Sequence, residues 1–350
     1  MFTRAKMYTV ESVTAGHPDK LCDRISDAIL DECIRHEPMS RVGIEAVGGH
    51  GLIALTGEIT TRGTIDYEGI ARRLYRDTGY PDEVRVVTSV VTQSPDIAQG
   101  VDTGGAGDQG IMYGYATDET PEFMPLGTVL AHALTRGLET LRVNGDIPWL
   151  RPDGKSQVTI GDGVVKTVLV SAQHAADVSP EEIRRIFIER LIMPIIGGVD
   201  GVEVLVNPTG RFVQGGFAAD AGLTGRKIMV DTYGGLIPHG GGCFSGKDPS
   251  KVDRSGAYMC RFVAKNLVAN GLAKEALVSV AYAIGRAEPL MVEAVNEKGE
   301  SLADFVRGKF DFRPRAIIER LDLRRPIYLG TAAYGHFGKP GFPWEEVVRL

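Results

Sequence analysis

The sequence has little cysteine and no long apolar run. Its four cysteines, Cys22, Cys33, Cys243 and Cys260, lie far apart, with no C-x-x-C pair, and fall mostly on helical patterns. This spacing suggests neither a zinc site nor a disulfide framework, so a reducing cytoplasm is the simplest location. No apolar run approaches the roughly 20 residues that span a bilayer. The start, M-F-T-R-A-K-M-Y, also lacks the apolar core of a signal peptide. We therefore expect a cytoplasmic protein that binds no membrane.

Excess positive charge is absent as well. The chain has 39 Lys and Arg against 45 Asp and Glu, a net charge of -6, and a pI near 5.7. Bulk electrostatics therefore give no reason to expect a nucleic acid partner, and any phosphate ligand must be held by a local basic pocket. The 43% hydrophobic and 24% charged content is ordinary for a soluble globular protein. A chain of 350 residues allows about two or three domains.

One stretch, His239 to Ser255, concentrates features that bind phosphate. It reads H-G-G-G-C-F-S-G-K-D-P-S-K-V-D-R-S. Glycines let backbone N–H groups approach a ligand closely, and Lys247 and Lys251 supply two ammonium groups. We place Asp248 and Pro249 at the N-cap and first position of a helix over 249–270, whose N-terminus favours an anion.

The same stretch fits the Walker A spacing G-x-x-x-x-G-K at Gly241 to Lys247. Asp248, however, stands where that loop needs a hydroxyl group for Mg²⁺, and Pro249 follows it. The strand expected at 227–231 is also separated from the glycines by a further loop. We therefore favour another kind of anion site, with a P-loop NTPase and a flexible surface loop as the alternatives.

The hydrophobic pattern recurs three times and predicts an α+β fold. In the first third it predicts strands at 7–10, 41–47, 52–59 and 84–91, and helices at 18–35 and 66–77. In the middle it predicts strands at 110–116, 156–160, 164–172 and 202–206, and helices at 126–143 and from Ser179, where Glu182 completes a capping box. In the last third it predicts strands at 227–231, 277–284 and 290–295, and helices at 249–270 and within 302–321.

We infer three similar β-α-β-β-α-β subdomains in a pseudo-threefold arrangement, each a sheet covered by helices on one face. Their expected ranges are 1–100, 106–222 and 223–350. Asp23, Asp27 and Asp31 stand four residues apart on the first helix, away from its apolar stripe. We interpret these three acids as the solvated back of that helix rather than a metal site.

Several sequence blocks together point to one family. They are G-H-P-D-K (16–20), G-E-I-T-T (57–61), Q-S-P-D-I (93–97), G-A-G-D-Q-G (105–110), R-P-D-G-K-S-Q-V-T (151–159), N-P-T-G-R-F (207–212), D-A-G-L-T-G-R-K (220–227), D-T-Y-G-G (231–235), the stretch His239 to Ser255, and A-A-Y-G-H-F-G (332–338). In this order they closely resemble the S-adenosylmethionine synthetase, or methionine adenosyltransferase, family of the bacterial and eukaryotic type. The resemblance runs from about Glu11 to Trp344.

The resemblance implies a transferase that joins ATP and L-methionine. The methionine sulfur attacks C5′ of ATP and expels tripolyphosphate, which is hydrolysed to phosphate and diphosphate, leaving S-adenosylmethionine. A neutral thioether has no proton to remove, so the first step needs alignment and charge neutralisation rather than a general base. That requirement explains a site rich in cations.

The resemblance also assigns site residues. The catalytic group comprises His17 at the leaving oxygen, with Lys155, Arg226, Lys227 and Lys247 around the polyphosphate. Further ATP contacts fall on Asp153, Gly154, Arg211, Phe212, Asp220 and Cys243. Methionine contacts fall on Glu58, Gln93, Asp220 and Lys251. Two Mg²⁺ are expected at Asp19 and Asp253, and one K⁺ at Glu45.

Taken alone, some of these residues have plainer interpretations. Asp19 would suit a helix cap with His17 on the surface, Glu45 the solvent face of a strand, and Phe212 an ordinary core position. The chain also departs from the family pattern. Cys243 stands where alanine is usual, the C-terminus stops soon after Trp344, and the segment matching the family's mobile loop, Gln93 to Thr103, is short. From the family we expect a homo-oligomer, a dimer with shared active sites that pairs further into a tetramer.

Overall fold

The first sheet is built on a hairpin whose two strands have alternating buried residues. In the computed structural model, which describes residues 6–92 and 104–350, β2 (Arg41–Gly49) and β3 (Leu52–Thr60) form an antiparallel hairpin, and β4 (Arg85–Val91) lies parallel to β3. The short strand β9 (Gly222–Leu223) pairs with the other edge of β2. Helix α1 (Pro18–His36) packs on β2, and α2 (Tyr67–Thr78) packs on β4 and α1.

The second sheet has the order β1-β6-β7-β8. Its strands are β1 (Met7–Val13), β6 (Leu150–Gly161), β7 (Val164–His174) and β8 (Glu203–Val206). Helix α4 (Leu126–Val143) packs on β1 and β6. The N-cap predicted at Ser179 is confirmed at α5 (Pro180–Phe187), where Ser179 Oγ accepts the Glu182 N–H at 3.2 Å. A π-helical turn (Ile188–Ile192) and α6 (Met193–Ile196) follow α5.

The third sheet has the order β11-β10-β5. It comprises β5 (Gly110–Thr117), β10 (Glu275–Tyr282) and β11 (Met291–Asn296). Helix α8 (Val252–Ala269) packs closely on it, because a Cβ at Gly114 of β5 would lie 2.1 Å from the carbonyl carbon of Cys260. Two short helices, α9 (Ala303–Lys309) and α10 (Pro314–Arg320), come near the end of the chain. Two 3₁₀ turns lie at Gly216–Ala218 and Pro343–Glu345.

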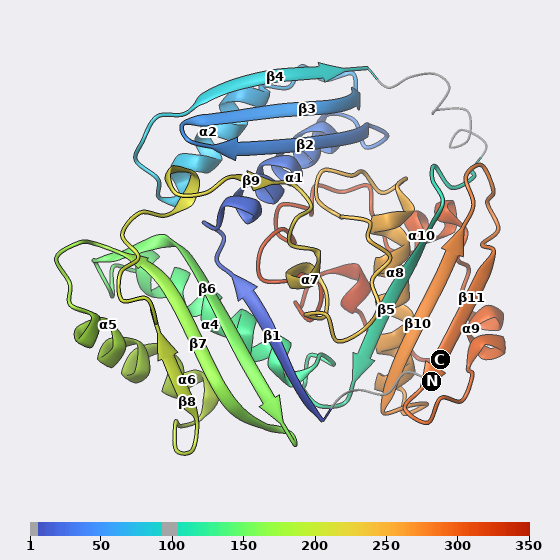
Figure 1. Cartoon of the computed structure of the whole chain (residues 1–350). Helices are drawn as coiled ribbons and strands as arrows, with labels where there is room; N and C mark the ends of the chain where they lie inside the picture. The colour runs from blue at the N-terminus through green and yellow to red at the C-terminus, as the bar shows by residue number, and fades with distance from the viewer. Residues whose placement is uncertain (1–5, 93–103) are drawn as a thin grey trace.

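Each sheet contains a strand from outside its own third of the chain. The N-terminal β1 pairs with β6, β5 pairs with β10, and β9 pairs with β2. Figure 1 shows the three sheets around the middle of the molecule, with β2–β4 at the top, β6–β8 at the lower left, and β5, β10 and β11 at the lower right. The expected α+β fold is confirmed. None of the described helices is long and apolar enough to cross a bilayer.

Two local predictions are wrong. Residues 227–231 are not a strand, because the helix α7 (Ile228–Asp231) forms there and the Asp231 N–H donates to Lys227 O at 2.9 Å. The α8 helix begins at Val252 with Lys251 as its N-cap, not at Asp248. Asp248 is instead tied to β2, since its Oδ2 accepts the Val42 N–H at 2.7 Å and its own N–H donates to Val42 O at 3.1 Å.

The prediction of a solvated acidic face on α1 is also wrong. Asp23 and Asp27 are fully buried, and Asp31 is 7% exposed. The cause lies in the tertiary structure. On this side α1 is covered by segments near Gly225, Gly246 and 328–329, whose backbone N–H groups donate to these acids.

Candidate active site

The start of α1 places a buried imidazole among cations. His17 is the N-cap of α1 and only 4% exposed, and its Nδ1 accepts the Asp19 N–H at 3.2 Å. Burial, together with the charges of Lys227 and Lys155, lowers the pKa of His17 to about 3, against the opposing effect of Asp19. The ring is therefore neutral at pH 7. Because Nδ1 accepts a hydrogen bond, the proton lies on Nε2, which becomes a donor.

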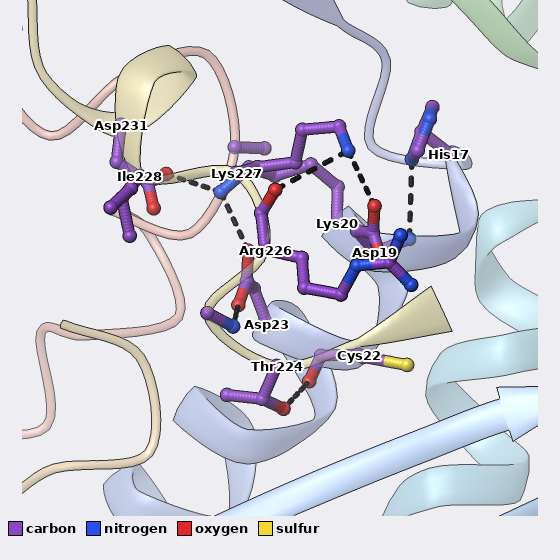
Figure 2. Close-up of polar contacts among 12 residues, drawn as sticks. His17, Asp19, Lys20, Cys22, Asp23, Thr224, Arg226, Lys227, Ile228 and Asp231 are labelled. Atoms are coloured by element: carbon purple, nitrogen blue, oxygen red, sulfur yellow. Dashed lines mark hydrogen bonds and ion pairs between the residues drawn. The ribbon is translucent and has the colours of Figure 1, made fainter. Parts of the chain in front are cut away.

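Asp19 contacts strand β9 and the loop that follows it. It forms an ion pair with Lys227, its Oδ1 accepts the Leu223 N–H at 2.9 Å, and Arg226 Nε lies 3.8 Å from Oδ1. Burial would raise the pKa of Asp19, but the hydrogen bonds from Lys227 and Leu223 outweigh it and lower that pKa. Figure 2 shows the Lys227 and Arg226 side chains reaching Asp19 from this loop, with His17 on the other side of Asp19.

The strand β6 brings Asp153, Gly154 and Lys155 to the same place. Lys155 is opposite Val13 in the β1–β6 register, and Gly154 O accepts the Thr14 N–H at 2.9 Å. The Asp153 Oδ2 atom accepts the Gly216 N–H at 2.8 Å. Its buried Oδ1 has no hydrogen-bond partner within the described chain, and burial raises the pKa of Asp153 to about 6. Such an orphaned acceptor would be satisfied by a hydroxyl group of a ligand.

The Gly-rich loop forms a second charged cluster. Lys247 Nζ lies 2.6 Å from Asp253 Oδ2. Burial would lower the pKa of Lys247, but Cys243 and Asp253 outweigh it and raise that pKa. Cys243 is half-buried and lies against Gly225, because a Cβ at Gly225 would lie 2.8 Å from the Cys243 Cβ. Lys251 pairs with the buried Asp248.

The Gly-rich loop is not built as a P-loop. A P-loop links a strand directly to a helix, and its lysine is followed by a hydroxyl side chain. Here the short helix α7 precedes the loop, and α8 begins only at Val252, after Lys247 and the paired Asp248. This arrangement agrees with the sequence argument against a Walker A site.

The remaining predicted residues lie farther out. Glu45 and Glu58 are exposed on the outer face of β2 and β3. Arg211 and Asp220 are exposed in the segment between β8 and β9. Phe212 is half-buried, its N–H donates to His174 Nε2 at 3.1 Å, and it belongs to neither apolar core of the described residues. Gln93 lies outside the described residues, as does the whole segment 93–103.

Sequence reasoning missed a buried charge network behind the site. Lys20 is fully buried, and its Nζ donates to Asp23 Oδ2 at 2.8 Å and to Asp231 (Figure 2). Burial would lower the pKa of Lys20, but Asp23 and Asp231 outweigh it and raise that pKa. The sequence offered one clue to this network: Lys20 ends the G-H-P-D-K block and Asp231 begins the D-T-Y-G-G block.

The two candidate metal ligands fit a metal that arrives with a phosphate ligand. Within the described residues, no group of three or more His, Cys, Asp or Glu could hold a metal alone. Asp19 and Asp253 are single carboxylates, each paired with a lysine. Mg²⁺ commonly takes one or two carboxylates and completes its shell with phosphate oxygens and water.

A cavity of the described chain lies away from these residues. It has a volume of about 630 Å³ and is lined by residues such as Tyr8, Ile160 and Leu277, from strands of the second and third sheets. None of the predicted site residues lines it. A smaller cavity, lined by residues that include Gly240, Gly242 and Asp253, lies beside the Gly-rich loop.

Comparisons with known proteins cover the whole chain. Family models for the N-terminal, central and C-terminal domains of S-adenosylmethionine synthetase match residues 5–95, 103–212 and 214–346. The S-adenosylmethionine synthase of Thermus thermophilus is 52% identical over 99% of this chain and 97% of its own length. That of Pseudothermotoga lettingae is 50% identical over 98% and 96%, and that of Deinococcus deserti 48% identical over 98% and 97%.

Proposed function

Because the chain belongs to the S-adenosylmethionine synthetase family, we propose that it is a methionine adenosyltransferase. It joins ATP and L-methionine into S-adenosylmethionine and, with water, releases phosphate and diphosphate. The observation that carries this proposal is the neutral, buried His17 set among Lys155, Arg226 and Lys227 at the start of α1. Such a site has a hydrogen-bond donor for a leaving oxygen and positive charge for the polyphosphate behind it.

The first chemical step needs no proton acceptor on the protein. The methionine sulfur attacks C5′, and the bond from C5′ to the triphosphate oxygen breaks. The His17 Nε2–H donates to that oxygen as negative charge develops on it. Lys155, Arg226, Lys227 and Lys247 hold the departing tripolyphosphate, and the same cations keep it in place for hydrolysis.

The substrate contacts follow from the charges that each substrate presents. Asp153 Oδ1, which has no hydrogen-bond partner among residues 6–92 and 104–350, accepts from a ribose hydroxyl beside Gly154, and Phe212 stacks on the purine near Arg211 and Cys243. For methionine, the acids Glu58 and Asp220 suit the ammonium group, Lys251 suits the carboxylate, and Gln93 completes the set.

Asp19 and Asp253 are proposed to hold two Mg²⁺, and Glu45 one K⁺. When bound, these ions would neutralise part of the polyphosphate charge. Lys227 and Lys247, which already contact the two proposed magnesium ligands, bind phosphate oxygens together with Lys155 and Arg226.

We further propose that two copies of the chain share each site. The groups that shift the pKa of His17, namely Lys227, Lys155, Asp19 and Lys20, all lie at or beside the start of α1. Glu45 and Glu58 instead lie on the outer face of the first sheet, where valines are exposed. A second copy seated on that face would bring its outer acids and Gly-rich loop to the His17 cluster, and dimers would pair into tetramers in the cytoplasm.

The direct test is product formation. With ATP, methionine, Mg²⁺ and K⁺, the protein should release phosphate and diphosphate only when methionine is present and should form the sulfonium product, detected by mass spectrometry. Methionine-independent release of ADP would instead indicate a nucleoside triphosphatase, and absence of the sulfonium product would refute the proposal.

A variant pair ties the activity to this site. His17→Asn keeps a good N-cap residue but loses the Nε2–H donor, so turnover should fall about 100-fold or more with the helix intact. The matched control is His36→Asn at the other, exposed end of α1, which should retain normal turnover. Near-normal turnover in His17→Asn would remove the proposed role of His17.

A further inference from the structure

Four aspartates form a ladder along one side of α1, and each binds the backbone of another segment. Asp19 accepts the Leu223 N–H at 2.9 Å, and Asp23 accepts the Gly225 N–H at 2.8 Å. Asp27 accepts the Gly246 N–H at 2.9 Å. Asp31 accepts the N–H groups of Tyr328 and Leu329, both at 2.9 Å. A single helix therefore fixes three segments that lie about 200 to 300 residues away in the sequence.

Asp23, the second aspartate of the ladder, fixes the loop that carries Arg226 and Lys227. Asp23 uses one oxygen for the Gly225 N–H, and its other oxygen accepts from Lys20 Nζ at 2.8 Å (Figure 2). Both Asp23 and Lys20 are fully buried, so the acceptor cannot turn toward solvent. The hydrogen bond is made immediately before Arg226 in the sequence, and thereby sets the direction in which the chain presents the two cations.

Asp27, the third aspartate of the ladder, fixes the backbone at Gly246 and, through Arg254, at Lys247. Arg254 donates to both oxygens of Asp27, at 2.8 and 2.7 Å, and each side chain is fully buried. Asp27 accepts the Gly246 N–H, while Arg254 Nη1 also donates to Lys247 O at 2.9 Å. The backbone that carries this lysine is therefore held by a buried ion pair at two adjacent points.

We propose that Asp23 and Asp27 are positioning residues, Asp23 for Arg226 and Lys227 and Asp27 for Lys247. This inference rests on the proposed function and deepens it. A long cationic side chain binds polyphosphate well only if its backbone is already in place, because ordering it during binding costs affinity. A carboxylate suits this task because it makes stronger hydrogen bonds to backbone N–H groups than a neutral acceptor does.

The structure supplies a matched control for this proposal. Asp31 belongs to the same ladder, is buried and accepts backbone N–H groups. It holds Tyr328 and Leu329, which carry none of the proposed polyphosphate ligands. Replacing it should therefore disturb the protein in a similar way without moving a site cation.

The kinetic test compares Asp23→Asn, Asp27→Asn and Asp31→Asn in the full-length protein. Asp23→Asn and Asp27→Asn should raise the KM for ATP and for added tripolyphosphate about tenfold, and in Asp23→Asn the KM for methionine should stay within about twofold. Asp31→Asn should leave all three KM values near those of the unaltered protein. Equal kinetic effects in all three variants, or an unchanged polyphosphate KM in folded Asp23→Asn, would overturn the proposal.

Hydrogen exchange tests the same ladder in the unaltered protein. This test therefore still applies if a variant fails to fold. The Gly225 and Gly246 amides lie in loops, yet both should be protected, because each donates to a buried carboxylate. Asp23→Asn should speed exchange at Gly225 but not at Gly246, and Asp27→Asn the reverse. Unprotected amides in the unaltered protein would refute the positioning role. A protected ladder in a protein that forms no sulfonium product would instead locate the failure in the proposed function.

Discussion

Burial keeps the imidazoles of His17, His132 and His336 uncharged. His17 and His132 have their pKa lowered to about 3, and His336 to about 4, with desolvation as the largest cause in each case. For His17 this neutrality is useful, because the ring can then donate from Nε2 while Nδ1 accepts the Asp19 N–H. For His132 the burial of the neutral ring only lowers stability, because one ring nitrogen is left without a partner in the described chain. Its Nδ1 is 2.8 Å from Ser12 Oγ, and its buried Nε2 has no hydrogen-bond partner in the described chain.

His132 should therefore make folding sensitive to acid. Its folded pKa of about 3 lies below the unfolded value of about 6.5. The unfolded chain thus takes up the proton first, and stability is fully present above pH 6.5 and is lost as pH falls. Replacing the ring by His132→Asn should remove up to about 1.4 kcal/mol per pH unit from the slope of unfolding free energy between pH 6.5 and 5.

Denaturant titrations of both proteins at several pH values measure this difference. Asp31 and Asp153, whose pKa values burial raises to about 6, contribute with the opposite sign, but they are present in both proteins and cancel in the comparison. Parallel stability profiles for His132→Asn and the unaltered protein would contradict the prediction.

At the scale of elements, the Gly-rich loop behaves as an extension of the first sheet. Gly246 O accepts the Ile44 N–H at 3.0 Å, and Lys247 forms an isolated bridge with Gly43. Gly246 has φ of +80°, and a Cβ there would lie 2.0 Å from Ile44 O. Only glycine allows the loop to approach β2 this closely.

Gly246→Ala should accordingly destabilise the protein. Gly241→Ala is the control, because Gly241 also has a positive φ, of +93°, but has open space around its Cβ position. Gly246→Ala should lower the unfolding free energy by about 2 kcal/mol more than Gly241→Ala does, since both share the backbone strain and only one adds a clash. Equal denaturant midpoints for the two variants would show that the loop accommodates the methyl group.

The sequence was a good guide where an element depends on its own pattern. The helix at 126–143 has the bounds that its apolar spacing predicts, and Ser179 caps the helix that follows it. It was a poor guide where distant residues decide. The 227–231 segment has the apolar character of a strand, but Asp231 is drawn to the buried Lys20, and Asp248 bonds to Val42 instead of capping α8.

The candidate site shows the same division. The blocks around His17, Lys155 and Lys227 could be recognised because local sequence carries them, and the fold brings them together at the start of α1. The ladder could not be recognised, since an i, i+4 row of acids normally faces water. Its partners, Gly225 and Gly246, lie about 200 residues away and offer only backbone N–H groups, which leave no mark in the sequence.

At the scale of the molecule, an apolar sheet face is left exposed. Val47 of β2 and Val87 and Val91 of β4 are 43%, 42% and 59% exposed on the first sheet. Glu45 lies two residues from Val47 on the same side of β2. An exposed apolar patch that also carries proposed site residues is the expected signature of an interface that completes a site.

With the site shared between two copies as proposed, Val47→Asp should separate the copies and abolish product formation together, because a buried unpaired charge opposes association. The control is Val164→Asp, since Val164 is 53% exposed on a hairpin of the second sheet and away from this face. Sedimentation velocity should show a monomer only for Val47→Asp. Unchanged sedimentation would place the interface elsewhere.

The exchange of strands among the three sheets limits how this enzyme can be divided. A fragment ending near residue 95 would retain β1 but lose β6, and a fragment beginning near residue 214 would retain β10 but lose β5. Each piece would expose an unsatisfied strand edge, which invites aggregation. A third of the chain taken from a relative must therefore form the same strand pairs with the other two thirds. A chimaera in which these pairs do not form should fail to fold as a whole.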